Sequence, residues 1–85
     1  MAVFVEITPE ARAQAARLSE PLRGRVLAIV GRLARWPAVS GAKPLRGGLA
    51  GRYWIRTGDY RVQFYLREGV IVVEKIGHRD GFYEE

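Results

Sequence analysis

Hydrophobic and polar residues alternate in the second half of the chain and recur at helical spacing in the first half. Three alternating runs cover residues 52–57, 60–66 and 70–76, with a glycine-containing turn between each run and the next. Alternation with a period of two is typical of a strand with one buried face, and links this short join antiparallel neighbours. The second half therefore predicts a three-stranded antiparallel sheet.

The first half predicts a short strand followed by two helices. Residues 3–7 alternate as a strand does, and Thr8-Pro9-Glu10 then indicates a helix start, because threonine caps, proline fits the first helical position and a carboxylate favours the positive end. A second helix carries an apolar stripe at helical spacing and ends at Trp36-Pro37. We expect one α+β domain over residues 1–85, with an antiparallel helical hairpin packed on one face of a mainly antiparallel, curved sheet.

The sheet face turned away from the hairpin is predicted to be basic and aromatic. In the simplest register it carries Arg52, Trp54, Arg56, Arg61 and Tyr65. Guanidinium groups hold phosphates, and flat aromatic rings stack on bases. These side chains, with Lys43 and Arg46 of the glycine-rich connector, are therefore candidates for RNA binding. A solvated face whose arginines only provide solubility is the alternative.

The charge of the chain points the same way. The formal net charge is +5, and twelve of the fourteen basic residues are arginine. Between Lys43 and Arg79 there are eight basic residues against three acidic ones, so the excess lies mostly on the predicted sheet. A basic sheet face favours an anionic partner such as a nucleic acid.

Several classes of protein are excluded by composition. Cysteine is absent, and no apolar stretch approaches the ~18 residues that a membrane span requires. The first residues lack the basic start and apolar run of a signal peptide, so a cytoplasmic location is expected. No carboxylates have metal-ligand spacing, and we expect neither a metal nor a cofactor.

The segment from Gly77 to Tyr83 is the strongest chemical signal. The last strand is predicted to stop at Gly77, and the only histidine, His78, comes directly after it, followed by Arg79 and later Tyr83. Histidine titrates near neutral pH, arginine is a fixed cation, and a phenol can stack or transfer a proton. Such a set can move protons and hold a phosphate without a metal. A surface or capping role for His78, and packing for Tyr83, are the alternatives.

Three motifs together resemble the RelE/ParE superfamily of toxins from toxin–antitoxin pairs. They are KPLRG at 43–47, GDYRVQFY at 58–65 and GHRDGFY at 77–83. The resemblance implies the RelE-like microbial RNase fold and a ribosome-dependent mRNA endonuclease. Such an enzyme cleaves without a metal, through attack of the 2′-hydroxyl on the scissile phosphate, and thereby inhibits translation.

The resemblance also assigns roles to individual residues. Arg61 matches a family arginine that contacts the scissile phosphate, and Arg79 matches a second arginine with a phosphate role. Arg56 lies where many members carry a catalytic lysine or arginine, while His78 and Tyr83 match C-terminal catalytic positions. The sequence departs from the family at Trp54, where the best-studied mRNA-cutting members carry lysine, and the identity of the general base stays open.

The partners implied by the resemblance are the ribosome, mRNA and a cognate RelB-like antitoxin, in a heterodimer or heterotetramer and without a membrane. Two other functions remain open at this point. A ParE-type toxin inhibits DNA gyrase and cuts no RNA, and a basic RNA-binding module has no toxicity. The set of Arg61, Arg79, His78 and Tyr83 favours the nuclease, whereas Trp54 argues modestly for the gyrase inhibitor.

Overall fold

The computed structural model describes residues 3–81 and confirms the α+β architecture. Tyr83 therefore lies outside the described residues. The helices are α1 (Pro9–Ala16) and α2 (Leu22–Arg32), and the strands are β1 (Phe4–Ile7), β2 (Lys43–Pro44), β3 (Arg52–Thr57), β4 (Tyr60–Arg67) and β5 (Val70–His78).

The strands form one five-stranded sheet in the order β1-β5-β4-β3-β2. The pairs β3–β4 and β4–β5 are antiparallel, as predicted. In addition, β2 pairs antiparallel with β3, and β1 pairs in parallel with β5 at one edge. The opposite edge is β2, which lies in the connector where the sequence predicted no strand. A strand of two residues that includes a proline carries too little alternation to be detected.

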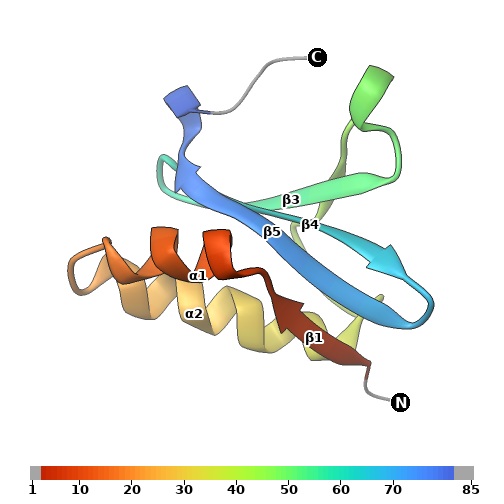
Figure 1. The fold of residues 1–85 in the computed structure, drawn as a ribbon, viewed down its shortest axis with the longest axis horizontal. Helices are drawn as coiled ribbons and strands as arrows, with labels where there is room; N and C mark the ends of the chain where they lie inside the picture. The colour runs from red at the N-terminus through yellow and green to blue at the C-terminus, as the bar shows by residue number, and fades with distance from the viewer. Residues whose placement is uncertain (1–2, 82–85) are drawn as a thin grey trace.

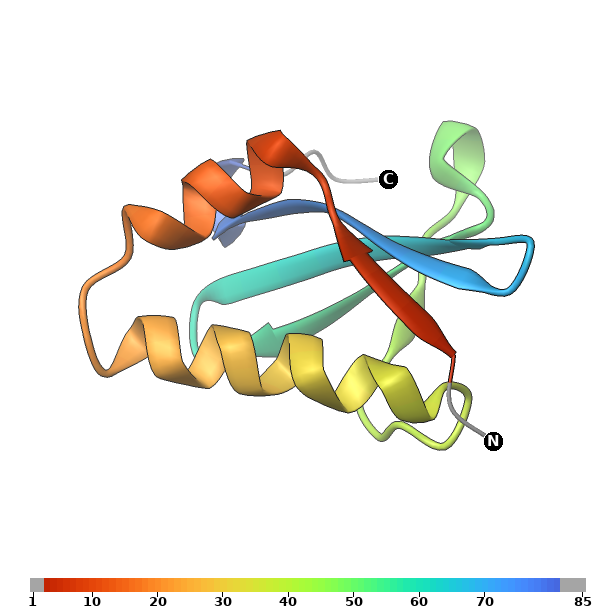
Figure 2. The ribbon, with the colours of Figure 1, turned by 60° about the horizontal axis from the view of Figure 1, so that its bottom comes forward.

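Both helices cover the same face of the sheet (Figures 1 and 2). The start of α1 is the one predicted, since Pro9 is at the first helical position and the Thr8 hydroxyl accepts a hydrogen bond from the Ala11 amide at 3.1 Å. A short link then turns the chain back, so that α2 runs antiparallel to α1 beneath the sheet. The 3-10 turn Leu33–Arg35 continues α2 toward Trp36-Pro37.

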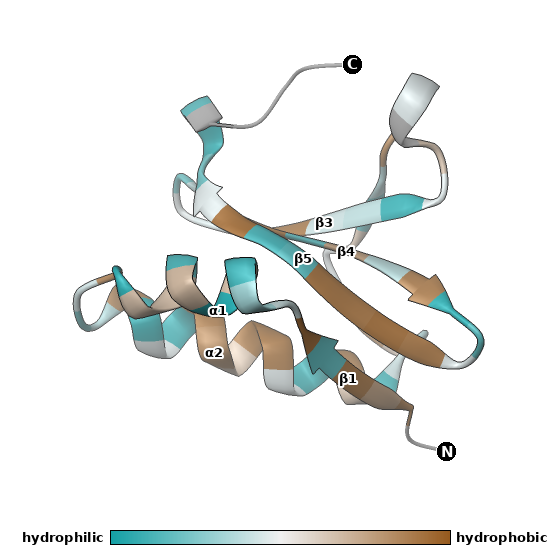
Figure 3. Cartoon of the chain, in the orientation of Figure 1, coloured by the Kyte–Doolittle hydropathy of each residue, from teal (hydrophilic) through white to brown (hydrophobic). Residues whose placement is uncertain are grey.

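The hydrophobic core fills the space between the hairpin and the sheet. Val26 from α2 and Leu33 from the 3-10 turn after it meet Val62 and Phe64 from β4, and all four side chains are fully buried. Figure 3 shows this layer as hydrophobic colour on α2 and on the first half of β5. Leu66 alternates with Val62 and Phe64 along β4 but is 46% exposed, because it lies near the β4–β5 turn, which extends past the hairpin (Figure 1).

One hydrogen bond ties α1 to the second half of β5. The pairing of β1 with β5 ends at Val73, and the Thr8 amide donates to the Val73 carbonyl at 3.0 Å. Beyond that point, the side-chain carbonyl of Gln14 accepts a hydrogen bond from the Ile76 amide at 2.7 Å. Gln14 thereby replaces a strand partner where β1 has ended.

Among residues 3–81, no helix is long and apolar enough to cross a membrane.

Candidate nucleic-acid interface

The open face, meaning the side of the sheet away from α1 and α2, has the predicted register. On β3 and β4, Arg52 lies opposite Tyr65, and Arg56 lies opposite Arg61. Between these two pairs, Trp54 lies opposite Gln63 on the same side, whereas Ile55 and Val62 point into the core. The two 3-10 turns Gly47–Leu49 and Arg79–Gly81 rise on this same side, at opposite ends of the sheet (Figure 1).

Arg56 and Arg61 bring two arginines to neighbouring positions on the open face. They are direct cross-strand partners, Arg56 is exposed, and the Nε atom of Arg61 is fully buried. Like charges directly opposite each other on a sheet destabilise the fold. An anion bound between them would relieve this repulsion, so the pair is suited to a phosphate.

Trp54 lies between basic residues of the two neighbouring strands. The Arg61 guanidinium carbon is 4.2 Å from the centre of the Trp54 ring, and Lys43 Nζ is 5.9 Å from it. Lys43 reaches this position because β2 places it directly opposite Trp54. The KPLRG segment thus forms the edge strand next to the open face, and Arg46 follows it as an exposed residue at the start of the next 3-10 turn.

Glu74 is the centre of a hydrogen-bonded network that the sequence analysis missed. Its Oε2 atom accepts a hydrogen bond from Arg52 Nε at 2.7 Å and another from Gln63 Nε2 at 2.8 Å. Arg52 also lies over the Tyr65 ring, with its guanidinium carbon 4.8 Å from the ring centre. The charge of Arg52 is therefore balanced within the protein.

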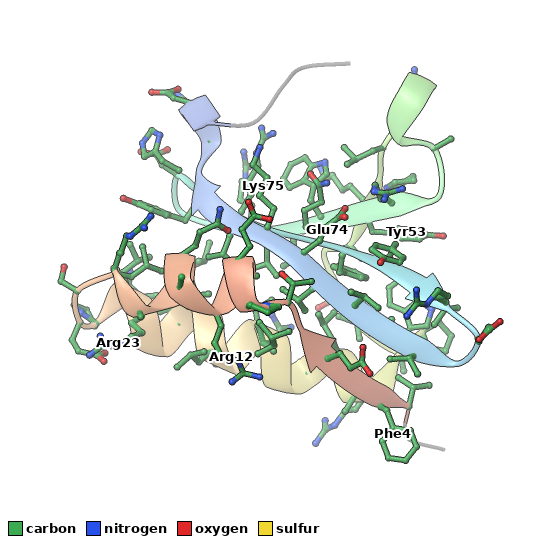
Figure 4. The ribbon with its side chains drawn as sticks, in the orientation of Figure 1. Phe4, Arg12, Arg23, Tyr53, Glu74 and Lys75 are labelled. Atoms are coloured by element: carbon green, nitrogen blue, oxygen red, sulfur yellow. The ribbon has the colours of Figure 1, made fainter. Side chains whose placement is uncertain are left out.

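A β-bulge brings Glu74 and Lys75 to the same side. Gln63 lies opposite Lys75, and the next residue, Phe64, lies opposite Val73, so Glu74 is the extra residue in β5. Lys75 consequently joins the open face, and Figure 4 shows it projecting from β5 away from the helices. The signal in the sequence was the pair of consecutive polar residues, Glu74 and Lys75, between the buried residues Val73 and Ile76.

His78 does not lie with the open-face residues. It is the last residue of β5, which continues through Gly77 rather than stopping there as predicted, because His78 still pairs with Tyr60. Tyr60 alternates with Arg61, so His78 is directed toward the helix side of the sheet. Its ring meets the Tyr60 ring edge-on at 5.2 Å, and its Nδ1 accepts a hydrogen bond from the Asp80 amide at 3.1 Å. The structure therefore separates His78 from Arg61.

Arg79 lies at the same end of the sheet as Arg56 and Arg61. Its amide donates to the Asp59 carbonyl at 2.7 Å, which fixes the start of the last 3-10 turn against the β3–β4 turn. Its side chain is 56% exposed. Its Nε atom lies 3.9 Å from Asp59 Oδ1 and 4.0 Å from Asp80 Oδ1. Exposed ion pairs this long hold a side chain weakly, so Arg79 can turn toward an anion.

Within residues 3–81, no group of three or more histidine, cysteine, aspartate or glutamate side chains could hold a metal ion. On the open face, the structure gathers cations, amide groups and aromatic rings, with Glu74 among them. This set can bind phosphate and can donate hydrogen bonds to a developing negative charge.

Comparison with solved structures relates this fold to a group of toxins. A chain of the RelBE2 toxin–antitoxin complex from Mycobacterium tuberculosis superimposes with a TM-score of 0.79 and 29% identity, covering 93% of this chain and 100% of that one. The chain has the fold of the RelE-like toxins. No protein-family model matches the sequence, and no curated protein matches it.

More distant RelE-like structures share the fold. The isolated Escherichia coli RelE toxin has a TM-score of 0.76 at 20% identity, covering 91% of this chain and 84% of the toxin. A YoeB/ParE toxin from Agrobacterium tumefaciens has a TM-score of 0.73 at 18% identity, covering 88% of this chain and 96% of that one. At these identities the likeness concerns the fold, and the chemistry has to be argued from the open face.

Proposed function

We propose that this RelE-like chain is the toxin of a toxin–antitoxin pair and that it inhibits translation as a ribosome-dependent mRNA endonuclease. The observation that carries the proposal is the direct pairing of Arg56 with Arg61 on an uncovered sheet face. Arg79 at the same end of the sheet adds a third cation. The repulsion within this cluster favours a bound polyanion over an open, solvated surface.

The proposed reaction needs no metal. The ribose 2′-hydroxyl attacks the adjacent phosphorus, the bond to the 5′-oxygen breaks, and the products are a cyclic phosphate and a 5′-hydroxyl. The phosphorane that forms carries an additional negative charge, which Arg61 and Arg56 are placed to stabilise through their N–H groups. Arg79 binds the same phosphate or a neighbouring one.

The reaction also requires one group that takes a proton and another that gives one. His78 and Tyr83 are the candidates from the sequence, but His78 lies toward the helix side and Tyr83 is outside the described residues. Lys75 is a further candidate, because its register places it on the open face opposite Gln63. Lys43, Arg46, Arg52, Trp54 and Tyr65 remain the proposed RNA-contacting set.

We further propose that a cognate RelB-like antitoxin neutralises the chain, in a heterodimer or heterotetramer. The structures that resemble this one include a RelB–RelE antitoxin–toxin complex from Methanococcus jannaschii. The open face offers exposed cations to an acidic segment that folds on binding, as amphipathic antitoxin segments can do.

Induced expression in a bacterial host tests the proposed activity. Wild-type protein should arrest growth, and primer extension on a reporter mRNA should show new 5′ ends within codons only while the message is translated. The same reporter with a disrupted start codon is the control. Continued translation together with loss of DNA supercoiling would instead assign the chain to the gyrase-inhibiting branch.

A further inference from the structure

Trp54 lies on the open face, on the strand next to the β2 edge, and is in contact with Arg61. The guanidinium carbon of Arg61 lies 4.2 Å from the ring centre, well inside the roughly 6 Å within which a cation is attracted to an aromatic face. Tryptophan is the aromatic residue that attracts cations most strongly. The two residues come from adjacent strands, Trp54 from β3 and Arg61 from β4, so the contact is fixed by the sheet register.

The orientation of the Arg61 guanidinium depends on the groups around it. Arginine has a long, flexible side chain, and Arg56 directly opposite repels its guanidinium. The buried Nε of Arg61 shows that the group lies down against the sheet instead of extending into solvent. The indole ring supplies an attractive surface that competes with the repulsion from Arg56.

We propose that Trp54 is a positioning residue that orients the Arg61 guanidinium toward the scissile phosphate, an inference that rests on the proposed nuclease function. Lys43, 5.9 Å from the same ring, approaches from the strand on the other side. Within the proposed RNA-contacting set, Trp54 thus acts through Arg61 and not by stacking on a base, because cations from both neighbouring strands approach its ring. The neighbouring pair provides a contrast, since Arg52 on Tyr65 is already held by Glu74.

Single-turnover cleavage on programmed ribosomes tests this role through Trp54→Leu and Trp54→Phe. The leucine variant should lower the maximal rate by about 3- to 30-fold, the size of one cation–π contact, with KM changed less than about twofold. The phenylalanine variant retains an aromatic face and should recover most of the rate. Phe4→Leu is the matched control, because it removes an aromatic ring that is 81% exposed at the far edge strand.

A double substitution decides whether Trp54 acts through Arg61. Adding Trp54→Leu to Arg61→Ala should cause no further loss of rate, because the group that is positioned is already absent. A full additional loss in the double variant, or a raised KM with an unchanged maximal rate in Trp54→Leu, would overturn the proposal and assign the ring to RNA contact.

A spectroscopic measurement is independent of catalysis. The side-chain Hδ and Hε resonances of Arg61 should be shifted upfield by the indole ring current and should return toward random-coil values in Trp54→Leu. Absence of that shift in the wild-type protein contradicts the contact itself. If the shift is present but the wild-type protein cleaves no mRNA on the ribosome, the proposed nuclease function fails while the contact stands; full cleavage by Arg61→Ala would overturn the positioning role of Trp54.

Discussion

At the scale of single residues, Arg61 is the side chain on which the proposed chemistry depends most. Arg61→Ala should lower cleavage by roughly 10²–10³, the loss typical for one group that stabilises a developing oxyanion. Arg61→Lys should recover only part of it, because an ammonium lacks the bidentate fork. Single-turnover rates measure both variants.

The stability of the same variants provides the control. Removing Arg61 relieves its repulsion with Arg56, so the free energy of unfolding in urea should change by no more than about 0.5 kcal/mol. Full cleavage by a folded Arg61→Ala protein would remove Arg61 from the phosphate site.

The second prediction at this scale concerns proton transfer. We expect Lys75→Gln to lower cleavage by about 10² or more, and His78→Gln to lower it less, because Lys75 shares the open face with Arg61 and His78 does not. Both substitutions keep a polar side chain that can donate a hydrogen bond but does not titrate. The opposite ranking of the two rates would show that His78 reaches the substrate despite its place in the register.

Residue alternation predicted the open face well and failed at two particular places. The faces of Trp54 and Arg61 follow from counting along regular strands, and the structure confirms them. Counting cannot locate a bulge, so the network of Glu74 and the position of Lys75 were missed. It also misplaced the end of β5, because glycine is permitted within a strand, and His78 was therefore read as a loop residue.

At the scale of elements, α1 and β5 are joined by the Gln14 side chain. Gln14→Leu should destabilise the fold by about 1–3 kcal/mol, because it leaves the Ile76 amide without its acceptor. Gln14→Glu keeps an acceptor and should cost less. Urea unfolding measures both, and Arg12→Ala, an exposed change on the same helix, should stay within about 0.5 kcal/mol of wild type.

Equal stability of Gln14→Leu and wild type would mean that water replaces the glutamine.

The helix itself was well predicted, since its start depends on local residues such as Thr8 and Pro9. Its hydrogen bond to β5 was not, because that bond links residues 62 positions apart in the sequence. Contacts of this kind depend on the tertiary arrangement of elements and leave no periodic signal.

At the scale of the whole molecule, the net charge of +5 should govern association with the proposed acidic antitoxin. The association rate should fall roughly tenfold between about 0.05 and 0.5 M salt, because screening weakens long-range attraction. Stopped-flow mixing measures this rate. Arg56→Gln should reduce the salt dependence, whereas Arg32→Gln on the helical hairpin should change it little.

A pulldown through a tag on just one of the two proteins is the companion experiment. Co-expression with the neighbouring small gene should recover both proteins together. Recovery of the tagged chain alone, tolerated by the cell, would contradict both the toxin assignment and its proposed partner.

Helices cover only one side of the sheet. Along each strand, one set of alternate residues therefore packs in the core and maintains the fold, and the other set determines the chemistry of the open face. On β3, a change at Tyr53 or Ile55 alters the core, whereas a change at Trp54 or Arg56 alters what the surface binds. Mutations of the second kind escape most selection for stability. Relatives of this chain can therefore diverge in target and rate while their backbones remain superimposable.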